Sequence, residues 1–420
     1  MKSKSLSLFR PTLSLVACAV AVAAAVPAAH AAENRSQRYT AGLGGSDMTT
    51  MLVPGWYGQV SMIHYHATKL KNQRGDDYTI NGSVPASQLA DGAAQAVATN
   101  VNPALATATR GAVLTALNGQ GLDYSASLTN FRADAYVMLP RITYISEHKL
   151  WGAHLGFTAM LPLVARQTSL AGQTAFTSNP TPAIATGVTG VLTSQSVPGA
   201  ATIGSNIANG VVGTAQSTVS SSVNSTLAAR NDQTFGIGDL EFAPVLNWEI
   251  GDHQTVTVTP TLVVPTGEYD KTQATNPGFG DYFTFRPSIQ YGFIGDGWDV
   301  GARAVFSFNS KNTETKYRSG NMFNLDFALM KFVSDNVRLG MMGYVVQQLQ
   351  DDSSEVAIDQ AAIDAADGNR MRAYALGPAL GWLYNGGEML IEGKILHEFG
   401  ARNRAEGTTY MLMVSKPFGL

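Results

Sequence analysis

Residues 298–309, Trp-Asp-Val-Gly-Ala-Arg-Ala-Val-Phe-Ser-Phe-Asn, decide the fold class of this chain. Every second side chain from Trp298 to Phe308 is apolar, whereas the positions between them include Asp299 and Arg303. Successive side chains of a β-strand point to opposite faces, so this alternation sorts apolar and polar groups onto two faces of one strand. The pattern predicts a strand with apolar surroundings on one side and a polar space on the other.

The same sorting recurs along the chain. It is clearest in residues 239–250, 255–264 and 281–293, which together with 298–309 form four consecutive strands. Extending this interpretation predicts twelve strands, near residues 56–69, 128–145, 151–165, 238–250, 253–266, 280–293, 297–309, 321–333, 336–349, 371–385, 388–398 and 408–418. An even number of strands returns both ends of a closed sheet to the same side.

The connections between these strands alternate between short and long. The short ones are residues 147–149, 251–252, 295–297, 334–335 and 385–387. Bacterial outer-membrane barrels have short periplasmic turns and longer outer loops. The sequence therefore predicts an all-β protein, a transmembrane antiparallel β-barrel of about 12 strands. The alternative, a soluble β-sandwich, explains single strands but neither this rhythm nor aromatic residues repeated on one exposed face.

Composition supports a membrane barrel and excludes other classes. Charged residues make up 14% of the chain, against roughly 25% in ordinary soluble domains. The formal charge is -3 without basic clusters, which argues against nucleic-acid binding. After the first thirty residues no apolar stretch approaches the roughly twenty residues that a membrane helix needs. A membrane protein with this profile must be a barrel.

The first 31 residues are typical of a secretory signal peptide. Basic residues precede an apolar run, and Ala29-His30-Ala31 forms a small-residue cleavage site. The mature barrel would then comprise residues 32–420, exported through the periplasm to the outer membrane of a Gram-negative bacterium. An alternative is a lipoprotein cleavage site at Leu15-Val16-Ala17-Cys18. Cys18 is the only cysteine, so the mature chain has no disulfide.

Two outer connections, residues 70–127 and 166–237, are unusually long. The second has no charged residue from Gln167 to Ala229, and we expect it to fold back into the mouth of the barrel. Within the first, residues 88–117 are rich in alanine and interrupted at Asn102-Pro103, which predicts two short helices. The alternative for both connections is mobile low-complexity sequence.

From Arg132 onward, over strands two to twelve, the chain resembles the family of outer-membrane proteins named for the meta-cleavage pathway of phenol degradation. The matching fragments include residues 139–144 (Leu-Pro-Arg-Ile-Thr-Tyr), 236–240 (Gly-Ile-Gly-Asp-Leu), 265–270 (Pro-Thr-Gly-Glu-Tyr-Asp), 276–278 (Asn-Pro-Gly), 317–320 (Tyr-Arg-Ser-Gly) and 403–407 (Asn-Arg-Ala-Glu-Gly). The resemblance implies a barrel associated with the uptake of aromatic or other hydrophobic compounds. The chain departs from the family in the uncharged insertion near 170–229 and in the acidic loop 351–367.

Strand parity places charged side chains in the lumen. The candidates for the substrate path are Arg141, Glu241, Arg286, Arg303, Asp326, Arg338, Glu392 and Lys394, and parity also directs Asp239, Glu249 and Asp299 inward. Both signs are present, so one interpretation is that these groups neutralise each other in a narrow barrel. The other is a ladder of arginines that polarises a phenolic or carboxylate solute opposite acidic groups.

Neither catalysis nor a cofactor is predicted. The phospholipase pattern of outer-membrane barrels is missing, and no paired acidic and His-Asp elements resemble those of the outer-membrane proteases. His64 and His66 share one face of the first strand, where two imidazoles can reach one metal ion, but no acidic partner lies near them in sequence. The interpretation is therefore that no metal binds, and that both histidines lie at the outer membrane interface with Tyr65 and Tyr57.

We expect passive transport of small hydrophobic or aromatic compounds. The alternatives are a general diffusion porin and a structural or adhesive barrel without transport. The first strand starts soon after the cleavage site, so we expect no large N-terminal plug domain. The expected partners are membrane lipid, lipopolysaccharide, a small hydrophobic solute and the barrel-assembly machinery.

The final strand supplies the contact with that machinery. Tyr410, Leu412, Val414 and Phe418 alternate on one face and resemble the terminal aromatic signal used in barrel assembly. Deletion of Phe418 to Leu420 should therefore block insertion, measured as surface exposure of the barrel in intact cells. Normal surface exposure of the truncated chain would contradict the prediction.

Overall fold

A computed structural model describes residues 37–418 of the chain. The expected signal peptide, its cleavage after Ala31 and the alternative lipoprotein site at Cys18 lie outside the described residues. The described residues divide into two compact units. The barrel unit comprises residues 37–78, 130–170 and 229–418, and the helical unit comprises residues 79–129 and 171–228.

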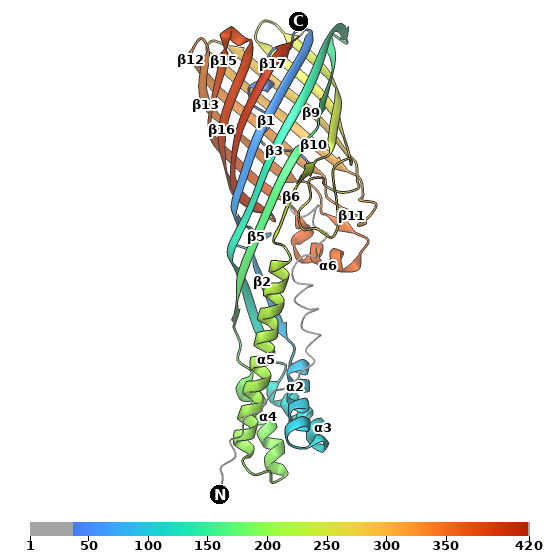
Figure 1. The fold of residues 1–420 in the computed structure, drawn as a ribbon, viewed down its shortest axis with the longest axis vertical. Coiled ribbons are helices and arrows are strands. Elements are labelled where there is room, and N and C mark those ends of the chain that lie inside the picture. The colour runs from blue at the N-terminus through green and yellow to red at the C-terminus, as the bar shows by residue number, and fades with distance from the viewer. Residues whose placement is uncertain (1–36, 419–420) are drawn as a thin grey trace. The chain divides into compact units, whose positions relative to one another are not determined.

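The barrel unit is a closed antiparallel sheet of 12 strands, which confirms the predicted fold class (Figure 1). The strands are β1 (Gly55–Leu70), β3 (Leu122–Leu150), β4 (Ala153–Met160), β7 (Leu240–Ile250), β8 (Gln254–Val264), β9 (Thr284–Gly295), β10 (Trp298–Asn309), β12 (Met322–Ser334), β13 (Val337–Gln348), β15 (Arg372–Tyr384), β16 (Met389–Arg402) and β17 (Ala405–Phe418). Each pairs with its neighbours in chain order, and β1 pairs with both β17 and β3. That double pairing closes the sheet.

The side chains alternate across the wall as the sequence predicted. On β10, Phe306 and Phe308 are exposed on the outer surface, whereas Asp299 and Arg303 are buried inside. The large exposed apolar residues on neighbouring strands share that outward parity, for example Phe285 on β9. Such an apolar outer surface suits contact with lipid. Among the described helices, none combines the length and apolar character needed to cross a membrane.

The predicted third strand, residues 151–165, extends too far at its outer end. β4 ends at Met160, and after Leu161-Pro162 the chain enters a separate strand, β5 (Leu163–Phe176). β5 lies between β3 and β6 (Asp232–Ile237), which the sequence analysis had placed in a loop. Proline has no N–H for the ladder, so a strand in the middle of a sheet cannot continue regularly through it. The Pro162 carbonyl instead accepts a hydrogen bond from the N–H of Gly238 at 2.8 Å.

Small elements complete the loops of the barrel unit. They are η1 (Ser46–Met48), β11 (Tyr317–Arg318), β14 (Ser353–Ser354), α6 (Ala357–Ala365), η3 (Asp367–Asn369) and η4 (Asn385–Gly387). β11 pairs with β14, which joins the connection after β10 to the connection after β13. The buried Asp352 carboxylate strengthens this join, because it accepts hydrogen bonds from the Tyr317 hydroxyl and from the N–H of Gly320.

The helical unit contains the two short helices predicted between residues 88 and 117. They are α2 (Ala86–Asn100) and α3 (Ala106–Leu117), separated by η2 (Pro103–Leu105). The Asn102 side chain accepts a hydrogen bond from the N–H of Ala104 and so starts the new turn. β2 (Thr79–Val84) pairs with the beginning of β3.

The uncharged insertion forms two further helices, α4 (Thr181–Ser194) and α5 (Ala200–Ala228), which neither expectation for this region included. α4 packs against α3 and α5. One apolar stripe explains the packing of α5, since its buried residues recur every four positions: Ile207, Val211, Ala215, Val219, Val223 and Leu227. Residues four apart lie on the same face of a helix. The expected fold-back of residues 166–237 into the barrel mouth stays a prediction.

This stripe can be tested with a matched pair of charge substitutions on α5. Val219→Asp places a carboxylate at a position that is 1% exposed, whereas Ser217→Asp places one on the exposed face. An unpaired charge away from water is costly, so Val219→Asp should open the helices to limited proteolysis within residues 171–228. Ser217→Asp should be cut at the wild-type rate. Equal cleavage of the two variants would contradict the assigned packing.

Candidate substrate path through the barrel lumen

The segment of residues 37–54, which precedes β1, lies inside the barrel and narrows its lumen. Tyr39, Leu43 and Met48 of this lumen segment are buried. Its polar atoms bond to inward-facing side chains of β3, β10, β12 and β16. The segment is too short to be a folded plug domain, but it occupies the space through which a solute would pass.

Two carboxylates of the wall hold the backbone of the lumen segment. Asp326 accepts hydrogen bonds from the N–H groups of Gly42 at 2.9 Å and Gly44 at 2.8 Å, and from the Tyr39 hydroxyl at 2.5 Å. Glu392 accepts from both the N–H and the hydroxyl of Ser46. Backbone N–H groups buried away from water need hydrogen-bond acceptors, so these contacts fix the segment at two places.

Lys394 adds a third wall contact, because its ammonium group donates to the Gly44 carbonyl at 2.8 Å. Close approach of the backbone is possible here because Gly44 has no side chain. A Cβ atom at this position would lie 2.8 Å from Sδ of Met48 and 2.9 Å from Cβ of Asp326.

Asp47 links the lumen segment to two arginines on opposite parts of the wall. Its carboxylate lies 2.8 Å from a guanidinium nitrogen of Arg141 on β3 and 2.8 Å from one of Arg303 on β10. Burial alone would raise the pKa of Asp47, but the attraction of Arg303 and Arg141 outweighs it and holds the pKa well below its usual range. Asp47 therefore stays ionised and pairs with both arginines, so its single negative charge offsets one of their two positive charges.

The beginning of the segment is held by Arg38. Its guanidinium group lies 2.9 Å from the Asp239 carboxylate and stacks 3.8 Å above the centre of the Tyr282 ring. It also donates to the Tyr282 and Gly280 carbonyls. These partners lie at the outer end of β7 and in the connection before β9, so Arg38 ties the segment to an outer loop.

Apolar packing places the segment against one side of the lumen. Met48 belongs to a buried cluster with Met330, Met342 and Leu396, which project inward from β12, β13 and β16. Burying such side chains stabilises by roughly 1.5–3 kcal/mol each. Apolar contacts on these three strands therefore add to the polar contacts that hold the segment.

A cavity of about 150 Å³ remains beside the segment. The wall contributes charged groups from Arg141, Glu241, Arg286 and Arg303, and the segment contributes Tyr39, Leu43 and Asp47. Hydroxyl groups of Thr143, Thr158, Thr257, Thr259 and Thr261 and the apolar side chains of Met160, Val245 and Val305 also line it. A cavity of about 150 Å³ can hold one benzene ring.

All eight candidates lie on the lumen side of the wall, but in three different settings. Arg141, Glu241, Arg286 and Arg303 line the cavity, whereas Asp326, Glu392 and Lys394 contact the lumen segment. Arg338 is fully buried against Asp299, away from the cavity. Of the other inward assignments, Asp239 binds Arg38, and Glu249 is exposed at the end of β7.

The arginines do not form a row of free cations. Arg141 and Arg303 pair with Asp47, Arg286 pairs with Glu241, and Arg338 pairs with Asp299. This arrangement fits the first of the two interpretations of the lumen charges, in which acidic and basic side chains offset each other in a narrow barrel. A solute that meets these arginines must compete with carboxylates already in place.

Sequence reasoning missed the residues of the lumen segment. Arg38, Tyr39, Ser46 and Asp47 precede the first alternating strand and belong to no periodic pattern. The available signal was local: Gly42-Leu43-Gly44-Gly45 lies next to Asp47, and glycines allow a backbone to approach its neighbours closely.

Removal of the Asp47 charge should open the lumen. Asp47→Asn keeps the shape of the side chain but leaves Arg141 and Arg303 without their carboxylate, and breaking a buried ion pair costs about 3–5 kcal/mol. We expect single-channel conductance in planar bilayers to rise several-fold. Asp252→Asn, an equal charge change in an exposed turn, should leave conductance unchanged. Wild-type conductance in the Asp47 variant would mean that this link does not hold the segment.

The contacts of Asp47 with the two arginines also predict how the conductance of the wild-type channel depends on pH. A carboxyl group whose pKa is lowered contributes its stabilisation above the ordinary pKa of about 3.9 and loses it only as the pH falls through the lowered value. The wild-type channel should therefore keep its low conductance from pH 7 down to pH 5. Opening within this range, measured in the same bilayers, would contradict the assignment.

Comparison with solved structures supports the architecture. The crystal structure of an outer membrane channel from Pseudomonas putida F1 matches with a TM-score of 0.54 and 11% sequence identity, over 90% of this chain and 100% of that chain. The P. putida toluene transporter TodX matches with a TM-score of 0.33 and 8% identity, over 88% of this chain and 91% of that chain. A Pseudomonas aeruginosa FadL homologue matches with a TM-score of 0.33 and 8% identity, over 87% and 91%. At scores this low, the last two carry no argument about this chain.

No curated protein matches the sequence. A family model does match, over residues 117–414, which is more than half of the chain. The matched region runs from the end of α3 through most of β17 and so includes the cavity residues contributed by the wall from Arg141 to Leu390. The chain belongs to the family described as "Putative MetA-pathway of phenol degradation".

Proposed function

We propose that this outer-membrane channel barrel passively transports small aromatic compounds that carry a hydroxyl or carboxylate group. The observation that carries the proposal is the cavity beside the lumen segment, which has the volume of one aromatic ring. Its lining combines an apolar part, from Leu43, Met160 and Val305, with arginines and threonine hydroxyls. A substituted aromatic ring could contact both kinds of surface.

The polar part of the lining narrows the substrate class. Glu241 and Arg286 form a buried pair at the cavity wall, and an arginine can bind a carboxylate through two parallel hydrogen bonds. An aromatic carboxylate could exchange with Glu241 or Asp47 for such contacts. A pure hydrocarbon would displace water from these polar groups and offer no hydrogen bond in its place, which is unfavourable.

The proposal also covers the route to the membrane. Residues 1–31 would direct export through the periplasm, and the β17 end at Phe418 would contact the barrel-assembly machinery. The apolar outer surface would then face membrane lipid and lipopolysaccharide. Transport would be passive diffusion: a solute displaces the lumen segment, passes along the arginine and threonine side of the lumen, and leaves on the periplasmic side.

The test is flux into proteoliposomes, with benzoate compared against arabinose and with protein-free liposomes as the background. Benzoate is ionised at neutral pH, so it crosses bare lipid more slowly than phenol. We expect the protein to raise benzoate flux at least about fivefold over the sugar. Equal flux of both solutes would identify a general porin, and flux of neither would favour a structural or adhesive barrel.

A double substitution tests the cavity directly. Glu241→Gln with Arg286→Gln removes both charges and keeps a polar side chain at each position, so benzoate flux should fall several-fold while sugar flux stays unchanged. The matched control is Lys271→Gln with Glu314→Gln, which removes an exposed pair 3.0 Å apart in the outer loops. If both double variants transport benzoate equally well, this cavity is not the substrate path.

A further inference from the structure

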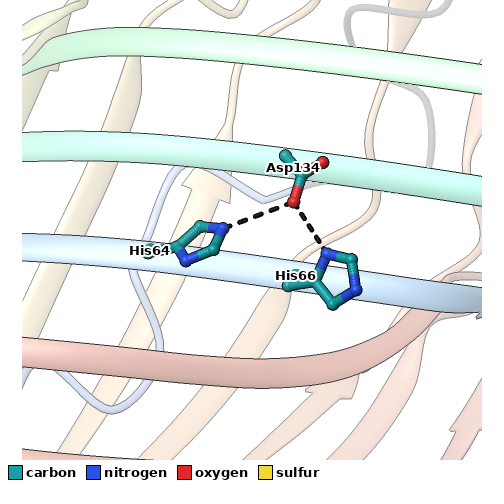
Figure 2. A group of neighbouring side chains, drawn as sticks. All are labelled: His64, His66 and Asp134. Atoms are coloured by element: carbon teal, nitrogen blue, oxygen red, sulfur yellow. Dashed lines mark hydrogen bonds and ion pairs between the residues drawn. The ribbon is translucent and has the colours of Figure 1, made fainter.

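Three side chains converge on the outer surface of the barrel, opposite the lumen. His64 and His66 project from β1, and Asp134 projects from the neighbouring β3 (Figure 2). One ligand atom from each, two ring nitrogens and a carboxylate oxygen, lie within 4.8 Å of one another. The sequence interpretation assigned no metal because no acidic partner was near, but the partner is 68 residues away from His66 and adjacent in the sheet.

The distances from Asp134 to the two histidines are close to those between ligand atoms of a metal site. Oδ1 of Asp134 lies 2.7 Å from Nδ1 of His66 and 3.3 Å from Nε2 of His64. Ligand atoms bound at about 2.0–2.1 Å in a tetrahedral zinc site lie roughly 3.3 Å apart. Small rotations of the two rings would bring all three atoms to one ion.

The neighbours of the three side chains already fix their orientation. Arg132 donates through Nε to Oδ2 of Asp134, whose side chain is only 1% exposed, so Oδ1 is directed at the histidines. The His64 ring stacks on Tyr136, with centroids 4.2 Å apart and planes at 5°, and also contacts Tyr410. Partners that orient ligands raise the affinity of metal sites.

The site lies just beyond a row of aromatic side chains. His64 is opposite both Tyr136 and Tyr410 in the sheet, and the next outward-facing row contains His66, Asp134 and Thr408. Such aromatic rows mark the membrane interface. The side chains of His64 and His66 are 34% and 37% exposed, so an ion could enter and keep a water ligand.

The prediction that His64 and His66 lie beside Tyr65 and Tyr57 is wrong. They lie on the opposite parity of β1, and the Tyr65 hydroxyl donates to Glu398 inside the barrel, while Tyr57 lines the lumen cavity.

We propose that His64, His66 and Asp134 bind one divalent transition-metal ion, such as Zn²⁺, Ni²⁺ or Cu²⁺, at the outer rim of the barrel. Two imidazole ligands select these ions over Ca²⁺ and Mg²⁺, which require oxygen ligands. The bound ion would join β1 to β3 on the outer surface. This site is separate from the lumen cavity and does not depend on the transport proposal.

The test is Zn²⁺ binding to the refolded full barrel in detergent, without a polyhistidine tag, measured by isothermal titration calorimetry. We expect about one Zn²⁺ per chain. His66→Ala and Asp134→Asn should each weaken binding at least about tenfold. His148→Ala, which removes an exposed histidine near the end of β3, should bind like the wild type. For each variant, a difference in gel mobility between heated and unheated samples shows that the barrel has folded.

Cu²⁺ provides a second readout that does not depend on affinity alone. Its electron paramagnetic resonance spectrum should show coupling to two imidazole nitrogens in the wild type and to one in His66→Ala. Absence of saturable Zn²⁺ binding, or wild-type affinity in a folded Asp134→Asn variant, would overturn the proposal. Equal weakening by His148→Ala would also overturn it, because the ion would then bind surface histidines in general.

Discussion

Closure of the sheet is the constraint on which the rest of this structure depends. Lipid offers no hydrogen-bond partner to a backbone N–H or C=O group, so a membrane sheet cannot have a free edge. Here β1 pairs with β17 from Trp56 to Leu70 and with β3 from Gly55 to Ala67, which removes both edges of the sheet. Because the wall is closed, strand parity then divides all its side chains between lipid and lumen.

A closed barrel creates an electrostatic problem inside. Charged side chains that face a narrow lumen lose much of their water, and each must find a partner. On the wall, Arg286 pairs with Glu241 and Arg338 pairs with Asp299, each on a nearby strand. Arg141 and Arg303 instead share Asp47, which belongs to the lumen segment. Two arginines of the wall therefore have a carboxylate partner only while that segment is inside.

The sequence predicted those features that depend on local pattern. All twelve strands could be located, most of them to within a few residues, because alternation is visible in a ten-residue window. The break at Asn102-Pro103 also correctly separated α2 from α3. The interruption after Met160 was also visible as Leu161-Pro162 but was read as part of one strand. In α5, the spacing of four between Ile207 and Leu227 indicates a helix, although the small uncharged residues obscured it.

The missed features depend on contacts between residues distant in sequence. Nothing near Asp47 in the chain indicates Arg303, and nothing near His66 indicates Asp134. Only the closed sheet and its register bring these groups together. The charged side chains that face the lumen could be predicted, because strand parity follows from the local sequence. Their partners could not, because pairing across the lumen produces no periodic pattern in the sequence.

The position of the lumen segment before β1 has a consequence for the order of folding. Gly42 bonds to Asp326, 284 residues later, and Gly44 bonds to Lys394, 350 residues later. Contacts over such separations form late, because the intervening chain must first be ordered. The lumen segment, although it precedes every strand of the barrel, must therefore wait for β12 and β16 before it can dock. A newly closed barrel would be permeable for a time, and it would seal its own lumen as the last step of its maturation.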